Sequence, residues 1–202
     1  MLLNHLWGLY AHPTTEWQNI QRSQTGLAGS LIYLAVLALL PSICVFISTA
    51  FIGWGFSALG KEITVLTLRS AIFIAVAGYF ALIASVVALG YLIYWMSSTF
   101  GSVASFSQGM KLAAYAATPL LMAALALFFP HPIFFMVVSL LAGLYSVYLL
   151  YCGIPVIMHV PEDRRFIYIT SILVAALVLL MCVLVAGILL LNFGLQPIYR
   201  QP

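Results

Sequence analysis

Histidine and carboxylate side chains in two short groups are the residues of this sequence best suited to chemistry. His12 and Glu16 are four residues apart in a segment that predicts a helix, and His159 lies shortly before Glu162 and Asp163. Imidazole and carboxylate groups bind divalent metal ions. No HExxH or paired-cysteine spacing accompanies them, so solvated surface groups are the alternative. The sequence thus makes His12, Glu16, His159 and Asp163 candidate metal ligands, and it predicts no cofactor.

A second group of polar side chains consists of hydroxyls at helical spacing. Tyr115 and Thr118 are three residues apart, and Tyr145, Tyr148 and Tyr151 repeat every three residues. Positions three apart share one face of a helix. Such faces, with Tyr115, Thr118, Tyr145 and Tyr148, could line a polar seam through a bundle. The alternative is that each hydroxyl forms a hydrogen bond between packed helices.

Long stretches without charge indicate the elements that must position these residues. Charged residues make up 5% of the chain, whereas soluble domains carry about a quarter. Uncharged stretches cover residues 23–60, 70–110, 112–161 and 166–199. As a single helix the third stretch would extend roughly 75 Å, and a bilayer core is about 30 Å thick, so it must cross a membrane twice. The sequence therefore predicts an all-α integral membrane protein.

Five transmembrane helices follow from these stretches. We expect them at residues 25–49, 71–95, 111–129, 133–152 and 166–192. Basic residues number four on the amino-terminal side and three on the other, which predicts a cytoplasmic amino terminus. The four are Arg22, Lys111, Arg164 and Arg165, and the three are Lys61, Arg69 and Arg200. Both candidate metal-binding groups then lie on the cytoplasmic side. Because the basic residues are scattered, no nucleic-acid partner is expected.

Acidic residues are absent from the predicted spans. They occur as Glu16, Glu62, Glu162 and Asp163. The carboxylate that usually couples a carrier to protons or sodium is therefore missing from the spans. Transport through broken helices stays open, because prolines can bend helices at Pro41, Pro119 and Pro155. No Gly-x-Ser-x-Gly elbow or zincin helix is present, so the chain is expected not to be an enzyme.

The residues before the first span predict two short helices. The first has an apolar face formed by Leu2, Leu3, Leu6, Trp7 and Tyr10. The second begins after His12-Pro13, with Thr15 and Gln18 spaced as a capping box and Trp17 and Ile20 on one face. Together they form an amphipathic collar that anchors the end of the chain. The alternative is that the collar senses membrane curvature or docks a partner.

The domain organisation follows from these elements. Residues 1–24 form the interfacial segment, residues 25–195 the five-span membrane domain and residues 196–202 a short tail. Residues 96–109 are rich in serine and glycine, so we expect a flexible connector there.

One segment resembles the hallmark of a known family. Residues 149–164 read Leu-Leu-Tyr-Cys-Gly-Ile-Pro-Val-Ile-Met-His-Val-Pro-Glu-Asp-Arg. Their Gly-x-Pro-x-x-Met-x-Val-Pro core resembles that of the Yip family, the Ypt-interacting proteins. Residues 101–119, with Ser-Phe-x-Gln followed by Ala-Tyr and Thr-Pro, are also similar to that family. The Pro-x-x-x-Trp opening at Pro13 and Trp17 is similar to bacterial members, so the likeness covers most of the chain.

The resemblance implies a five-span protein of the bacterial inner membrane with a cytoplasmic amino terminus. Eukaryotic members associate with Rab-type GTPases and with one another. Their long cytoplasmic amino-terminal region is reduced here to residues 1–24, which argues against a GTPase partner. The partners that we expect are the lipid bilayer, a second copy of the chain or another membrane protein.

The hallmark also has a physical interpretation as the exit from the fourth span. Gly153 permits close packing, Pro155 bends or ends the helix, and Pro161 keeps the preceding residue extended. The corner comprises Gly153, Pro155, Val160, Pro161, Arg164 and Arg165. We expect it to contact lipid headgroups or a partner; the alternative is that it only ends the helix. The leading hypothesis is a non-enzymatic organiser of membrane proteins or lipids, and the rival is a small channel or carrier for a solute or an ion, including a divalent metal.

Overall fold

The computed structural model describes residues 4–23, 25–53, 66–102, 104–129 and 131–193. The predicted tail, Leu2, Leu3 and the side chains of Leu6 and Trp7 lie outside the described part. The amino-terminal helices are α1 (Asn4–Ala11) and α2 (Pro13–Arg22). The elements that follow are α3 (Leu27–Ile47), η1 (Ser48–Ile52), α4 (Leu68–Ser97), η3 (Ser98–Phe100), α5 (Phe106–Ala116), α6 (Thr118–Met122), η4 (Ala123–Phe128), α7 (Pro132–Met158) and α8 (Glu162–Phe193).

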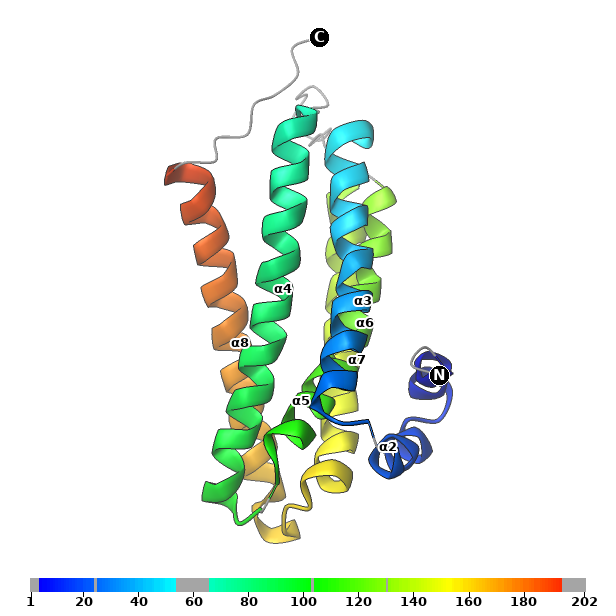
Figure 1. Ribbon diagram of the computed structural model, residues 1–202, viewed down its shortest axis with the longest axis vertical. Coiled ribbons are helices and arrows are strands. Elements are labelled where there is room, and N and C mark those ends of the chain that lie inside the picture. The colour runs from blue at the N-terminus through cyan, green and yellow to red at the C-terminus, as the bar shows by residue number, and fades with distance from the viewer. Residues whose placement is uncertain (1–3, 24, 54–65, 103, 130, 194–202) are drawn as a thin grey trace.

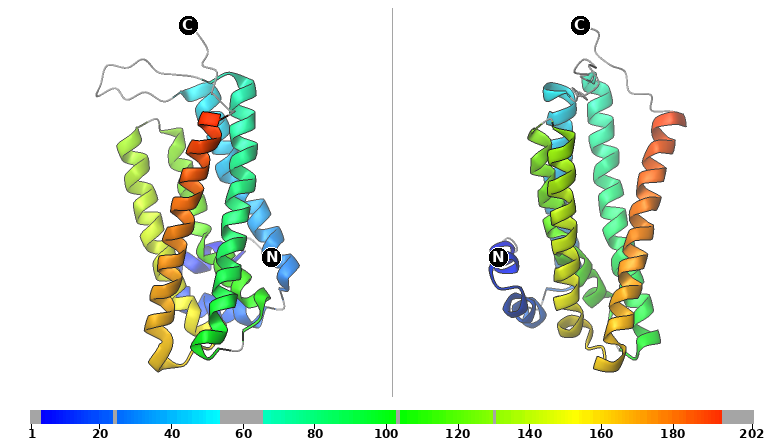
Figure 2. Two further views of the ribbon diagram at one scale, coloured as in Figure 1. Left: turned by 90° about the vertical axis from the view of Figure 1, so that its left-hand side faces the viewer. Right: turned by 180° about the vertical axis from the view of Figure 1, so that it is seen from behind.

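Among the described residues, five helical stretches are long and apolar enough to cross a membrane, which confirms the predicted fold class. They are Leu27–Ile52, Leu68–Phe100, Phe106–Phe128, Pro132–Met158 and Glu162–Cys182. The stretches run side by side along the long axis of the molecule, and α1 and α2 lie beside the bundle rather than within it (Figures 1 and 2). We call these two helices the collar, and the end of the bundle that carries them the collar end.

Helical structure continues through α4 and η3 to Phe100, and the third span begins at Phe106. The prediction of a flexible connector over residues 96–109 was therefore wrong for most of its length. Ser105 and Gln108 form a capping box, because the Gln108 N–H donates to the Ser105 hydroxyl at 3.4 Å and the Ser105 N–H donates to Gln108 Oε1 at 2.7 Å. This motif starts the helix before Lys111. The fourth span likewise continues beyond residue 152, to Met158.

Of the three prolines expected to bend helices, Pro119 coincides with a break. The third span changes from α5 to α6 at Thr118 and then tightens into the 3₁₀ turns of η4. In contrast, α3 continues through Pro41 and α7 through Pro155. A proline within a helix removes one backbone hydrogen bond but does not always end the helix.

The third span forms the centre of the bundle. Residues 109–116 of α5 are all buried. A Cβ added to Gly109 would lie 2.6 Å from the carbonyl oxygen of Gly90, so α4 and α5 touch backbone to backbone. In α8, the Tyr168 hydroxyl donates to the Ile93 carbonyl of α4 at 2.6 Å near the collar end. Farther along, α8 diverges from α4 (Figures 1 and 2).

Candidate functional site

The collar docks on the bundle through Trp17, which is fully buried. A Cβ added to Gly153 of α7 would lie 2.7 Å from Trp17 Cε2 and 2.6 Å from Leu112 Cδ1. Any side chain larger than hydrogen at this position would therefore displace the indole or the leucine. The Trp17 ring also meets the ring of Tyr115 edge to face, with centroids 6.5 Å apart. Gly153 thus provides a depression for the central residue of α2.

Two side chains of the bundle donate hydrogen bonds to the carboxyl ends of the collar helices. Lys111 Nζ donates to the carbonyls of Ile20 at 3.4 Å and Ser23 at 3.2 Å, at the end of α2. The Tyr145 hydroxyl donates to the Leu9 carbonyl at 2.9 Å, near the end of α1. The last carbonyls of a helix lack partners within it, and its carboxyl end favours a cation. Residues of α5 and α7 therefore supply hydrogen-bond donors to the carboxyl ends of both collar helices.

Tyr10 adds a ring contact to this attachment. Its ring stacks on that of Tyr145 with centroids 5.4 Å apart, and its hydroxyl donates to the sulfur of Met122 at 3.7 Å. Burial, with a smaller contribution from Tyr145, raises the pKa of Tyr10. The phenol therefore stays protonated and remains a donor.

Replacing Lys111 by methionine should loosen the end of α2. Methionine keeps the unbranched apolar stem of lysine but removes the charge beside the carboxyl end of α2. The loss should lower the stability of this helix end by about 1 kcal/mol. Hydrogen exchange of a peptide covering residues 13–23 would measure the effect. Arg164→Met is the matched control, because Arg164 is an exposed cation in the first turn of α8 and does not lie at the carboxyl end of α2. Equal exchange in the two variants would contradict the role given to Lys111.

The structure divides the predicted corner into a buried and an exposed part. Gly153 and Val160 are buried and Pro155 is half-buried, so these residues shape the interior. Pro161 and Arg164 are exposed. Helix α7 ends at Met158 and is followed by His159, a capping residue with a φ of 51°. The Ser102 hydroxyl donates to the Met158 carbonyl. The connector from α4 to α5 is thereby tied to the corner.

The charges of the corner balance one another. Arg165 Nη2 lies 3.5 Å from Glu162 Oε1, and Arg164 Nε lies 3.9 Å from Asp163 Oδ2. These partly exposed pairs contribute little to stability. The two carboxylates lie in the first turn of α8, where the helix dipole favours negative charge. The corner therefore presents both signs of charge rather than a basic patch.

The four candidate metal ligands are not gathered into one cluster. His159 is exposed and its Nε2 lies 2.9 Å from Nε2 of Gln21, while His12 is exposed at the start of α2. The Glu16 carboxylate packs over Gly8, since a Cβ there would lie 2.1 Å from Glu16 Oε2. Within the described ranges, no group of three or more His, Cys, Asp or Glu side chains could hold a metal ion. Metal binding stays a prediction.

The predicted capping box of α2 was wrong. The Thr15 hydroxyl donates to the His12 carbonyl at 2.9 Å, and His12 makes no side-chain cap. Because Pro13 fixes the first helical position, the cap falls on His12, and Thr15 is too late in the helix to serve as one.

The residues of the proposed polar seam separate into two places. Tyr115 and Thr118 are buried beside Tyr33. The Tyr33 hydroxyl lies 2.7 Å from Thr118 Oγ1, and the Tyr33 ring stacks on the Tyr115 ring with centroids 4.4 Å apart. Tyr145 faces the collar, and Tyr148 is 46% exposed. The buried group links the collar to the break in the third span. Whether any of these residues lines a pathway stays a prediction.

Sequence reasoning missed Lys111 and Tyr33 as parts of this site. For Lys111 a signal existed, because it is the only charged residue between Arg69 and Glu162. Ionisable residues within apolar stretches usually pair with other charged groups or with backbone carbonyls. For Tyr33 no local signal existed, since its partner Thr118 is 85 residues away along the chain.

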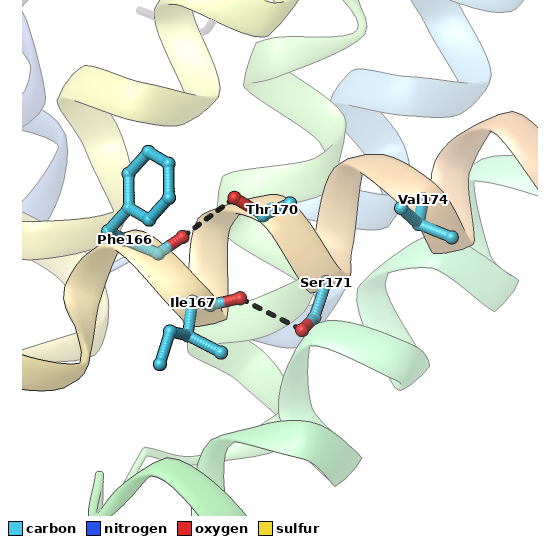
Figure 3. A pocket seen from close by; sticks show the side chains of 5 residues that line it. All are labelled: Phe166, Ile167, Thr170, Ser171 and Val174. Atoms are coloured by element: carbon cyan, nitrogen blue, oxygen red, sulfur yellow. Dashed lines mark hydrogen bonds between the residues drawn. The ribbon is translucent and has the colours of Figure 1, made fainter.

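A hollow of about 380 Å³ lies on the surface of α8 (Figure 3). It is lined by Phe166, Ile167, Thr170, Ser171 and Val174. The Thr170 hydroxyl donates to the Phe166 carbonyl at 2.9 Å and the Ser171 hydroxyl to the Ile167 carbonyl at 2.8 Å, as Figure 3 shows. Both donors are therefore used within the helix. The hollow suits lipid chains better than a polar substrate.

Comparisons with known proteins identify the family of this chain. The Yip1 domain model matches residues 7–184. The chain is 30% identical over 193 residues to the inner membrane protein YohC of Escherichia coli strain K12, covering 95% of this chain and 98% of that protein. The same values hold for inner membrane protein YohC of E. coli O6:H1 strain CFT073. No solved structure matches. Because the family model covers most of this membrane bundle, the chain belongs to the Yip1 domain family.

Proposed function

We propose that this protein is a non-enzymatic organiser of the bacterial inner membrane that presents its collar end to membrane proteins or lipids. The main support for this proposal is the docked collar. Trp17, Lys111 and Tyr145 use their contacts to fix a surface in place, and none of them lines the hollow on α8 or the smaller one between α3 and α4. A polar surface that is held beside the bundle in this way suits recognition of a partner better than turnover of a substrate.

The surface that would meet a partner is polar and of mixed charge. It combines the outer face of α2 with the exposed part of the corner. Its exposed residues are Gln18, Asn19, Gln21, Arg22, Pro161, Glu162, Asp163 and Arg164. Since the corner charges pair locally, contacts would depend on shape and hydrogen bonds more than on long-range attraction. A headgroup, a second copy or another membrane protein could each provide such contacts.

Photo-crosslinking in living cells tests the proposed organising function. A benzophenone amino acid at Gln18 or Arg164 should give discrete adducts with lipid or with one membrane protein, identified by mass spectrometry. Leu140 is the matched control, because it is 61% exposed but lies within the span of α7. Adducts at Gln18 and Arg164 no different from those at Leu140 would contradict the proposal. These positions are better probes than Gly153, where a larger side chain would also displace Trp17.

We propose further that the collar end is cytoplasmic. Support comes from the four basic residues assigned to this side, against three on the other. In a cysteine-free protein, Arg164→Cys should react with a membrane-impermeant maleimide in inside-out vesicles and stay unlabelled in right-side-out vesicles. His131→Cys, at the start of α7, should show the opposite pattern. Labelling of Arg164→Cys from outside would reverse the orientation.

The break in the third span favours a second candidate, a small channel or carrier. Broken helices at mid-membrane free carbonyls that can bind ions, and here the break lies beside the Tyr33–Thr118 hydrogen bond. In proteoliposomes with dyes for protons and divalent metals, this candidate predicts a flux that Thr118→Val and Tyr115→Phe reduce. Tyr148→Phe, at an exposed position, is the control. A flux equal to that of empty liposomes would contradict transport of these ions.

A further inference from the structure

The apolar stripe of α2 suits a second environment besides the bundle. Trp17 and Ile20 are both fully buried in the docked collar, while Gln18 and Asn19 between them are exposed. A short helix with a Trp-containing stripe and a polar opposite face also suits the bilayer interface. We propose that the collar exchanges between this docked state and a state in which Trp17 and Ile20 insert among phospholipids. The inference deepens the proposed organising function, on which it rests, by naming lipid as the collar's second partner.

The docked state leaves a polar group of its central residue unsatisfied. Trp17 Nε1 is buried and has no hydrogen-bond partner among the described residues. A buried donor without an acceptor is destabilising. At the bilayer interface the indole N–H meets headgroup oxygens and water while the ring stays in an apolar environment. Lipid insertion would therefore relieve an unfavourable feature of docking without exposing the ring to water.

The contacts of the collar allow it to leave the bundle as one unit. The Glu16 carboxylate packs over Gly8, which holds α1 and α2 together. The bundle donates hydrogen bonds to carbonyls at the carboxyl ends of the two helices, from Lys111 to Ile20 and from Tyr145 to Leu9. The contacts of Tyr10 with Met122 and of Gln21 with His159 join side chains only. Breaking these bonds removes no hydrogen bond within either helix. Docking and release therefore need no unfolding of the collar.

Fluorescence of Trp17 in lipid bilayers tests the exchange. The full chain would carry phenylalanine in place of Trp7, Trp54 and Trp95, so that Trp17 is the single reporter. The bilayers would contain phosphatidylcholine and phosphatidylglycerol with brominated acyl chains, which quench tryptophan on contact. In the parent protein, we expect a small quenched fraction from the lipid-inserted state. Gly153→Ala should raise the ratio of inserted to docked collar about tenfold, because it overpacks the docked state.

Gly143→Ala is the matched control on the same helix. A Cβ there would meet only Leu120 Cδ1, at 4.0 Å, so quenching should not change. Lys111→Gln provides a second route to release and should also raise quenching. The inference is overturned if both variants leave Trp17 unquenched by lipid, or if they expose it to aqueous acrylamide instead. Such a collar would not enter lipid, but Gln18 and Arg164 would still give the crosslinks that the proposed function predicts. Failure of the inference is therefore distinguishable from failure of the proposed function.

Discussion

Replacing Trp17 by alanine should release the collar and lower the free energy of unfolding by about 3–5 kcal/mol, as expected for truncation of a buried aromatic side chain. The side chain is fully buried over Gly153 and meets the edge of the Tyr115 ring. Without it, Ile20 alone would have to hold α2 by apolar contact. Thermal unfolding in detergent, with hydrogen exchange of residues 4–23, would measure both effects.

The neighbouring exposed position supplies the control for this substitution. Gln18→Ala removes a side chain of similar length from the outer face of α2 and should leave stability and exchange close to those of the parent. If Trp17→Ala behaved like Gln18→Ala, the collar would not depend on the depression at Gly153.

Gly109→Ala should destabilise the bundle by about 1–3 kcal/mol through overpacking. The added Cβ would lie 2.6 Å from the carbonyl oxygen of Gly90 and 3.2 Å from the backbone nitrogen of Tyr94. Both atoms belong to the backbone of α4, so no side-chain rotation can make room for the methyl group. The two helices must move apart, although alanine favours the helix more than glycine does.

Gly78→Ala separates packing from helix propensity. Gly78 lies in α4, and a Cβ there meets no atom within 4 Å. This variant should be as stable as the parent or up to about 1 kcal/mol more stable, because alanine lowers the entropy of the unfolded chain. Chemical denaturation in mixed micelles would compare the two variants. A Gly109→Ala protein as stable as Gly78→Ala would show that α4 and α5 are not in backbone contact.

The sequence was sufficient to predict the five spans, and the reason is physical. A bilayer excludes charge and sets a minimum length for a crossing, so the distances between charged residues determine where helices lie. The helical spacing of Trp17 and Ile20 likewise predicted one apolar face. Periodicity cannot tell whether such a face meets lipid or protein. In the structure, it meets the bundle.

Contacts between distant segments account for what the sequence left undetermined. Tyr115 and Tyr148 each lie on a predictable helix face, but the rotation of one span against another decides whether those faces meet. The bundle buries Tyr115 beside Tyr33 and leaves Tyr148 exposed. Motif choice also depended on context. Thr15 and Gln18 match the capping-box spacing as well as Ser105 and Gln108 do, yet a true cap requires its serine or threonine immediately before the first helical residue.

Crosslinking between Gln21 and His159 tests the docked collar most directly, because these side chains join α2 to the end of α7 at 2.9 Å. In a protein with Cys44, Cys152 and Cys182 replaced by alanine, Gln21→Cys and His159→Cys should form a disulfide within one chain when membranes are treated with a mild oxidant. Gln21→Cys paired with Val178→Cys of α8 is the control and should stay reduced. A docked collar predicts efficient crosslinking of the first pair alone. Failure of that pair to crosslink within the chain, with both cysteines reactive, would contradict the account.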